Sequence, residues 1–356
     1  MKRTLILLAL AVCLLGGQAG AAELPREVAD AAPKAAELVG DDPANGFGLA
    51  GGVRVLLDGA LEEMKDYLFS GVRAVGAIMA GVVLLGAVES AAPAGKELLG
   101  RYGTAIGALW VTAMAAGDLD SLMGLGRETV LRISQLSKAL LPTMAAAEAA
   151  SGGVTAASVR QVAAVFFSDV LLTAIDRLLL PAVYLYVGIA AAGTVLEGEA
   201  MERIGELLKK AVSWALGGML VLFTTYLTVS GAVAGAADAQ AVKAAQAAVS
   251  AAVPVVGGIL AEAAESVLAG AGLLRGMIGT AGTLALLGAC LLPFLRLGCQ
   301  YLLYQGASLV AAAAGPGKLT KLIARLGDAF ALVLAMTGAS AVLLLISLLS
   351  AMKAVI

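Results

Sequence analysis

The stretch PVVGGILAEAAESVLAGAGLLRGMIGTAGTLALLGACLLPFLR, residues 254–296, indicates the fold more clearly than any other part of the chain. It opens with Pro254 and the glycine pair Gly257 and Gly258, and then runs mostly apolar, with Arg275 inside the apolar part. A break followed by a long apolar run is typical of a membrane segment that is broken or re-entrant and leads into a spanning helix. We therefore predict such a segment here.

Composition extends this interpretation to all 356 residues, of which 60% are hydrophobic and 14% charged. Soluble domains carry about 25% charged residues, so much of this apolar surface needs lipid around it. We predict an all-α, polytopic transmembrane helical bundle with the lipid bilayer as its partner.

The chain contains no His, which removes the commonest general base and metal ligand. We expect no enzyme activity, no cofactor and no nucleic acid partner, because no phosphate-binding glycine loop or dense basic cluster is present.

The first 22 residues have the pattern of a secretory signal peptide. Lys2 and Arg3 precede the apolar run from Leu5 to Leu15, and small residues follow at 19–21. A retained first membrane helix is the alternative. Residues 23–67 are expected to form an extracytoplasmic segment that ends in an amphipathic helix over 53–67.

Residues 68–356 are predicted to form a multi-span membrane domain. The expected spans are 68–90, a weaker 102–117, 212–235 and 329–350, and 297–314 is a further apolar segment. The apolar segment 162–196 exceeds the roughly 20 residues of one span, so it is either a half-helix followed by a span or one long tilted helix. Residues 118–160 are predicted to be an interfacial helix followed by a loop. Residues 197–211 and 315–328 are predicted to be charged loops, which the positive-inside rule places on the inner side with 91–101.

Two proline landmarks recur at the same offset along the chain. Pro142 and Pro181 lie in Leu-rich sequence, as do Pro254 and Pro293, and the two pairs have equal spacing. This pattern indicates a possible parallel repeat with units of about 96–196 and 205–312, although two prolines in Leu-rich sequence can also match by chance.

Charges inside or beside the apolar segments are the candidates for chemistry. Each faces the bundle interior, a partner or water, because a charge at the bilayer centre costs about 3 kcal/mol on insertion scales. The alternative for these charges is a place at helix ends near the lipid headgroups. Cys290 and Cys299 are interpreted as small buried hydrophobic residues. The candidate positions are Pro142, Asp169, Asp176, Pro181, Pro254, Gly257, Gly258, Arg275 and Pro293.

Two blocks of the sequence resemble a known family. The segment from Thr224 to Gly276 and the block LLPFLRLGCQYLLYQ, residues 291–305, are similar to the stage III sporulation protein AE family of endospore-forming bacteria. Asp238 is followed here by Ala239, where the family usually has Gly. Outside about 220–310 the likeness is loose.

The resemblance implies a membrane subunit of a channel or secretion-like complex that links the mother cell and the forespore. It implies a location in the mother-cell membrane around the engulfed forespore, with other stage III A proteins and a forespore membrane partner. It also implies a separate ATPase subunit, and it assigns no catalytic residues. Two alternatives remain: a stand-alone secondary transporter with its site at the breaks near Pro142 and Pro254, and an intramembrane enzyme that uses Asp169 and Asp176.

Overall fold

The computed structural model describes residues 49–91, 97–150, 154–196, 199–252, 257–314 and 316–353, and within these ranges the chain is helical without any strand. This confirms the predicted all-α fold. The elements are α4 (Leu49–Ala91), α5 (Glu97–Ala150), α6 (Val154–Ala174), the π-helical turn η1 (Ile175–Leu179), α7 (Leu180–Leu196), α8 (Glu199–Ala252), α9 (Gly257–Ala314) and α10 (Gly317–Lys353).

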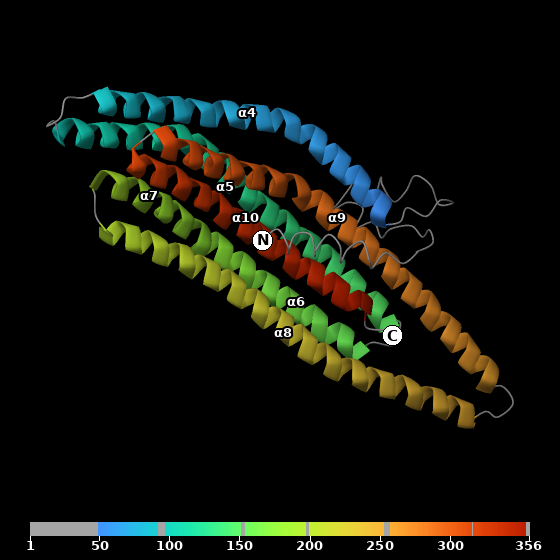
Figure 1. Ribbon diagram of the computed structural model, residues 1–356. Helices are drawn as coiled ribbons and strands as arrows, with labels where there is room; N and C mark the ends of the chain where they lie inside the picture. The colour runs from blue at the N-terminus through green and yellow to red at the C-terminus, as the bar shows by residue number, and fades with distance from the viewer. Residues whose placement is uncertain are drawn as a thin grey trace.

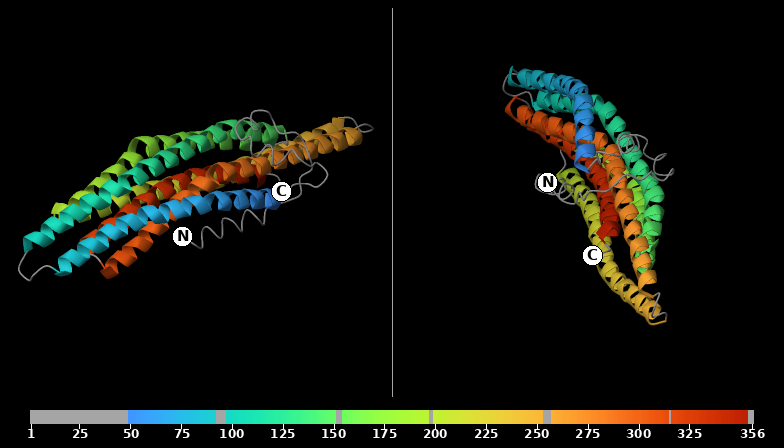
Figure 2. Two further views of the ribbon diagram at one scale, coloured as in Figure 1. Left: turned by 90° about the horizontal axis from the view of Figure 1, so that it is seen from above. Right: turned by 90° about the vertical axis from the view of Figure 1, so that its right-hand side faces the viewer.

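The helices pack as long antiparallel rods, each reversing the direction of the one before it (Figure 1). We call the end of the bundle where α10 begins the near end. The C-terminal ends of α4, α7 and α9 lie there, together with the beginnings of α5, α8 and α10. We call the other end, where α4 begins and α10 ends, the far end. The rods curve gently along their length, as the two further views show (Figure 2).

Helix α10 lies at the centre of the bundle (Figure 1). Its sequence is apolar on nearly every side after Asp328, which is the pattern of a buried helix. Its side chains Leu319, Leu322, Leu326 and Phe330 are completely enclosed. Helices α4 and α8, at opposite edges of the bundle, bury one face each. In α4 the buried positions Ala60, Met64, Val75, Ile78 and Val82 follow helical spacing.

Helices α6 and α7 form one rod that is joined through the π-helical turn η1. The N–H of Leu180 bonds to the carbonyl of Ile175, five residues earlier. Pro181 follows directly, and a proline cannot donate a hydrogen bond and crowds the carbonyl four residues before it. The wider π turn accommodates this residue without ending the rod. Of the two alternatives for 162–196, the structure has the single long helix.

Other boundaries differ from the sequence predictions. Helix α5 is continuous through Pro142, so the weak span at 102–117 and the interfacial helix after it are one element. Helix α9 is continuous from Gly257 through Pro293. A re-entrant segment that starts with a break at Pro254 stays a prediction. Residues 199–211 and 317–328 are helical rather than loops. Pro254 and the predicted signal peptide lie outside the described residues.

Packing explains why the prolines do not end these helices. A proline removes one backbone hydrogen bond, and neighbouring helices in a bundle hold the rod straight enough to continue. Pro142 is exposed and Pro293 half-buried, so each ring lies at a position where the bundle leaves it room.

Five helices are long and apolar enough to cross a membrane, within the residues described. They are Gly52–Val88, Gln161–Leu196, Ala200–Val229, Ala281–Ala313 and Gly317–Ser350. Each exceeds the roughly 20 residues that a bilayer requires. The fold is therefore a multi-span membrane bundle whose rods extend beyond the hydrocarbon. The internal repeat stays a prediction.

Candidate functional site: two polar clusters between the helices

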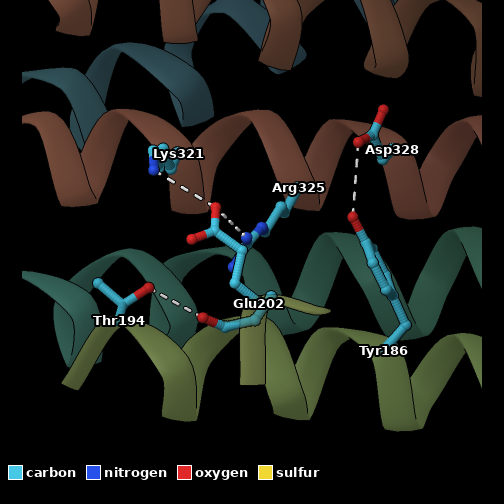
Figure 3. Close-up of polar contacts among 7 residues, drawn as sticks. Tyr186, Thr194, Glu202, Lys321, Arg325 and Asp328 are labelled. Carbon is cyan, nitrogen blue, oxygen red and sulfur yellow. Dashed lines mark hydrogen bonds and ion pairs between the residues drawn. The ribbon is translucent and has the colours of Figure 1, made fainter. Parts of the chain in front are cut away.

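A cluster of charged side chains joins α7, α8 and α10 near the beginning of α10 (Figure 3). Lys209 Nζ lies 2.7 Å from Asp328 Oδ2, and the Tyr186 hydroxyl donates to the same oxygen at 3.5 Å. One turn nearer the start of α10, Glu202 Oε1 lies 2.7 Å from Arg325 Nη2 and 3.3 Å from Lys321 Nζ. We call these six residues the α10 cluster.

Helical spacing brings the α10 cluster together. Glu202 and Lys209 are seven residues apart on α8, which places them on one face. Lys321, Arg325 and Asp328 follow each other at four and three residues on α10, so they face α8 as one row. The Arg325 side chain is only 14% exposed and that of Asp328 only 21%, so both charges depend on their partners rather than on water.

A second cluster joins α4, α5 and α9, and we call it the Asp118 cluster. Asp118 Oδ2 accepts hydrogen bonds from Gln300 Nε2 at 2.8 Å and from the Tyr304 hydroxyl at 3.3 Å. Nearby, Arg296 Nη2 lies 3.7 Å from Glu63 Oε2, and the guanidinium lies 5.5 Å from the centre of the Tyr67 ring. That geometry combines a weak ion pair with a cation–π contact.

The Asp118 cluster is less completely satisfied than the α10 cluster. The buried atoms Arg296 Nε and Gln300 Oε1 have no hydrogen-bond partner. Burial raises the pKa of the Asp118 carboxyl above its ordinary value, while the hydrogen bonds from Tyr304 and Gln300 act in the opposite direction. Here neutral donors, not a cation, hold the carboxylate.

A third group of polar contacts lies at the surface between α5 and the α6–α7 rod. Arg127 Nε lies 2.6 Å from Asp176 Oδ1, and the Tyr184 hydroxyl donates to Asp120 at 3.4 Å. The Arg127 side chain is more than half exposed. Exposed pairs of this kind contribute little to stability.

The structure does not bring the sequence-predicted candidates into one site. Asp169 is exposed on α6, whereas Asp176, which lies on η1, pairs with Arg127 of α5. Pro142, Pro181 and Pro293 lie inside α5, α7 and α9 respectively. Gly257 and Gly258 open α9. Pro254 and the side chain of Arg275 lie outside the described residues, and the candidate role of all these positions stays a prediction.

Sequence reasoning missed the α10 cluster because its charges were assigned to loops. The available signal was the spacing: charges three, four and seven residues apart in 199–211 and 317–328 fit two helix faces that meet. It also missed Asp118, which follows an apolar run and was assigned to a connection. Cys290 and Cys299 are free thiols; Cys290 is buried as predicted, whereas Cys299 is only half-buried.

Neither cluster has the composition of a metal site or a hydrolytic centre. Over the described ranges, no group of three or more Cys, Asp and Glu side chains could hold a metal ion. The clusters can hold the helices together, and they can keep charged side chains at fixed positions along the axis of an apolar bundle. This arrangement, with five candidate spans, defines a polytopic helical membrane protein.

Comparison with known proteins then gives the family. Residues 47–354 match the family model of stage III sporulation protein AE, so the chain belongs to that family. Stage III sporulation protein AE of Bacillus subtilis (strain 168) is 21% identical over 264 residues, which cover 72% of this chain and 66% of that relative. The match thus spans just under two thirds of the relative's length. No solved structure matches this chain.

Proposed function

We propose that this protein is an integral membrane subunit of a multiprotein channel or secretion-like complex that links mother cell and forespore and is required for endospore development. Family membership over nearly the whole chain supports the sporulation role. The candidate spans support a multi-pass place in a cell membrane. On this proposal the membrane is that of the mother cell around the engulfed forespore, and the N-terminal signal directs the chain into it.

The observation that carries the subunit role is the position of α10 at the centre of the bundle. A solute that crossed through one chain would need a path along the bundle axis, and enclosed side chains such as Leu322, Leu326 and Phe330 fill that axis. Close-packed interiors of this kind do not double as pores. A passage would instead form between this chain and its partners.

The partners on this proposal are the other stage III A sporulation proteins and a protein of the forespore membrane. A separate ATPase subunit would supply energy. A stand-alone secondary transporter is the second candidate, supported by the proline-containing helices and the polar clusters inside the bundle.

Two measurements test the proposal. A deletion of the gene should stop endospore development after engulfment, and a copy tagged at residue 353 should restore it. The tagged protein, solubilised from sporulating cells in mild detergent, should then be recovered with single-pass and ring-forming membrane partners. Normal sporulation after deletion would overturn the sporulation role. Purification as a single chain that moves a solute across liposomes would favour the transporter.

A further inference from the structure

The outer surface of α4 carries an apolar band that extends almost to the C-terminal end of this helix, at the near end of the bundle. Its exposed side chains include Leu68, Phe69, Val72, Leu84 and Val88, and Leu84 is 67% exposed. The band is about 30 Å long at 1.5 Å per residue, close to the thickness of the hydrocarbon core of a bilayer. One charged side chain, Arg73, is exposed within it near its beginning, where a long side chain can reach toward the headgroups. Toward the far end, the exposed face of α4 mixes the apolar side chains Val55, Leu57 and Leu61 with charged ones. The exposed charged residues there are Arg54, Asp58, Glu62, Glu63, Lys65 and Asp66.

Helix α8, at the opposite edge, has the reverse order. Its first turns, at the near end, carry Glu202, Arg203, Glu206, Lys209 and Lys210. Ile204 and Leu207 are exposed among these charges, and the charge-free exposed band that follows them includes Trp214, Val221, Leu222, Tyr226 and Val229, with Trp214 82% exposed. The sequence of α8 stays free of charge until Asp238, so this band also approaches bilayer thickness.

Contacts between neighbouring helices fix the relative level of these two bands. A side chain at Gly71 of α4 would meet Leu303 of α9. The next residue, Tyr304, packs on Phe330 of α10 with ring centres 5.0 Å apart. Two residues before Phe330, Asp328 pairs with Lys209 of α8.

Gly71 and Lys209 therefore lie at about the same level of the bundle. From this level the α4 band runs toward the near end, because α4 runs in that direction. The α8 band runs toward the far end for the same reason (Figure 1). The apolar bands at the two edges are displaced along the bundle axis by roughly the length of one band.

No flat bilayer perpendicular to the bundle axis can cover both bands. A bilayer at the level of the α4 band would also enclose the charges of α8 and the α10 cluster. One at the level of the α8 band would leave Leu84 and Val88 in water and enclose the charges of α4. One placed midway would put both polar clusters in the hydrocarbon, where charge is strongly disfavoured.

We infer that the bundle crosses the bilayer obliquely, with lipid hydrocarbon covering the α4 band on one side and the α8 band on the other. The two edges are three helix-to-helix steps apart, through α9 and α10, at about 8–10 Å per step, so the axis tilts roughly 45° from the bilayer normal. This tilt lies just beyond the usual range of helix tilts, and each band of about 30 Å then covers about 20 Å of the hydrocarbon depth. The α10 cluster then meets one membrane surface and the Asp118 cluster the other, although both lie at one level of the bundle.

Four single-cysteine variants test the tilt in single-chain nanodiscs, in a background where Cys13, Cys290 and Cys299 are replaced by Ser. Leu84→Cys and Glu206→Cys form the first pair. Leu85 of α4 and Leu319 of α10 both lie against Gly107 of α5, so they are at one level of the bundle. Glu206 lies between Glu202 and Lys209 of α8, which pair with Arg325 and Asp328 farther along α10. Leu84 is thus nearer the near end than Glu206. Glu62→Cys and Leu222→Cys form the second pair, with Leu222 nearer the far end.

Each site carries a nitroxide whose collision rates with oxygen, which enters lipid, and with a water-soluble nickel chelate are measured. The tilt predicts a ratio of oxygen to nickel collisions several-fold higher at residue 84 than at 206, and several-fold higher at 222 than at 62. An upright bundle reverses at least one of these orders, which would overturn the inference. Shielding of residue 84 or 222 from both reagents would also overturn it, because protein rather than lipid would then cover that band. Unchanged gel-filtration profiles confirm that each variant is folded.

Discussion

The two polar clusters lie at one level of the bundle but are built on different principles. In the α10 cluster each carboxylate, Glu202 and Asp328, has a cation within 2.7 Å. In the Asp118 cluster the half-buried carboxylate of Asp118 is held by an amide and a hydroxyl, and the ion pair of the cluster, Arg296 with Glu63, is long at 3.7 Å. The first cluster therefore ties α8 to α10 by charge. The second joins α5 to α9 by hydrogen bonds from neutral donors, and α4 to α9 by a long ion pair and a cation–π contact.

This difference suggests where the bundle is firmly joined and where it can adjust. Paired charges at low exposure are costly to separate, because each would be left uncompensated. A cluster that already contains unsatisfied atoms, Arg296 Nε and Gln300 Oε1, loses less when it rearranges. We expect partner binding or membrane strain to alter the α4–α9 contact before the α8–α10 contact.

The largest effect is expected from Asp328→Leu, which leaves Lys209 without its anion and Tyr186 without its acceptor. The free energy of unfolding should fall by about 3 kcal/mol, measured by denaturant titration in detergent. Adding Lys209→Met should restore most of the loss, because removal of both charges also removes the uncompensated one. A double variant as unstable as the single one would mean that the pair is not what holds α8 to α10.

The next effect concerns the packing of α5 on α10, on the far-end side of both clusters. A Cβ at Gly126 would overlap the stiff, branched Val333 side chain, whereas one at Gly124 has open space. Gly126→Ala should lower the free energy of unfolding by about 2 kcal/mol through overpacking. Gly124→Ala on the same helix should raise it by up to about 1 kcal/mol, since Ala favours the helix over Gly. Equal effects would show that α5 and α10 do not pack this closely.

Asp118→Asn should have a smaller effect, of the opposite sign to Asp328→Leu. Because burial raises the folded-state pKa of Asp118, its contribution to stability is fully present at acid pH and is lost as pH rises through that raised value. Asn keeps an acceptor for Gln300 and Tyr304 without the charge. The midpoint of thermal unfolding of Asp118→Asn, relative to that of the native chain, should therefore rise between pH 4 and pH 7.

Asp118→Leu is the contrasting variant, because it removes the acceptor as well as the charge. It should be destabilising at both pH values, since Gln300 and Tyr304 lose their partner. A constant difference between Asp118→Asn and the native chain across this pH range would contradict the raised pKa.

The membrane fold could be read from the sequence because apolar runs such as 329–350 are long enough to need lipid. Where helices begin could not be read from hydropathy. Lys321 and Arg325 lower the hydropathy of 315–328 to that of a loop, yet Glu202 on α8 neutralises them inside a helix pair. That pairing joins residues more than a hundred positions apart, which local pattern does not reveal.

The prolines misled in the opposite direction. Pro142 and Pro293 have the local features of breaks, but their helices continue because packing along the rest of each rod outweighs one missing hydrogen bond. Asp118 was overlooked because its partners Gln300 and Tyr304 lie on a helix far along the chain. Asp176 was chosen for its apolar surroundings in sequence, yet it lies near the surface with Arg127.

The smallest effect is expected at the surface pair of Asp176 and Arg127, which serves as the exposed reference with which both clusters are compared. Asp176→Asn removes the partner of Arg127, whose side chain is more than half exposed, so water can replace the lost contact. The free energy of unfolding in detergent should change by less than about 0.5 kcal/mol. Sporulation frequency in cells carrying this variant should equal that of the native chain, and the same is expected of Asp169→Asn. A loss of sporulation with the fold intact would show that these carboxylates act in the membrane, as the intramembrane-enzyme alternative requires. It would also mean that exposure in a single chain does not describe their surroundings in the complex.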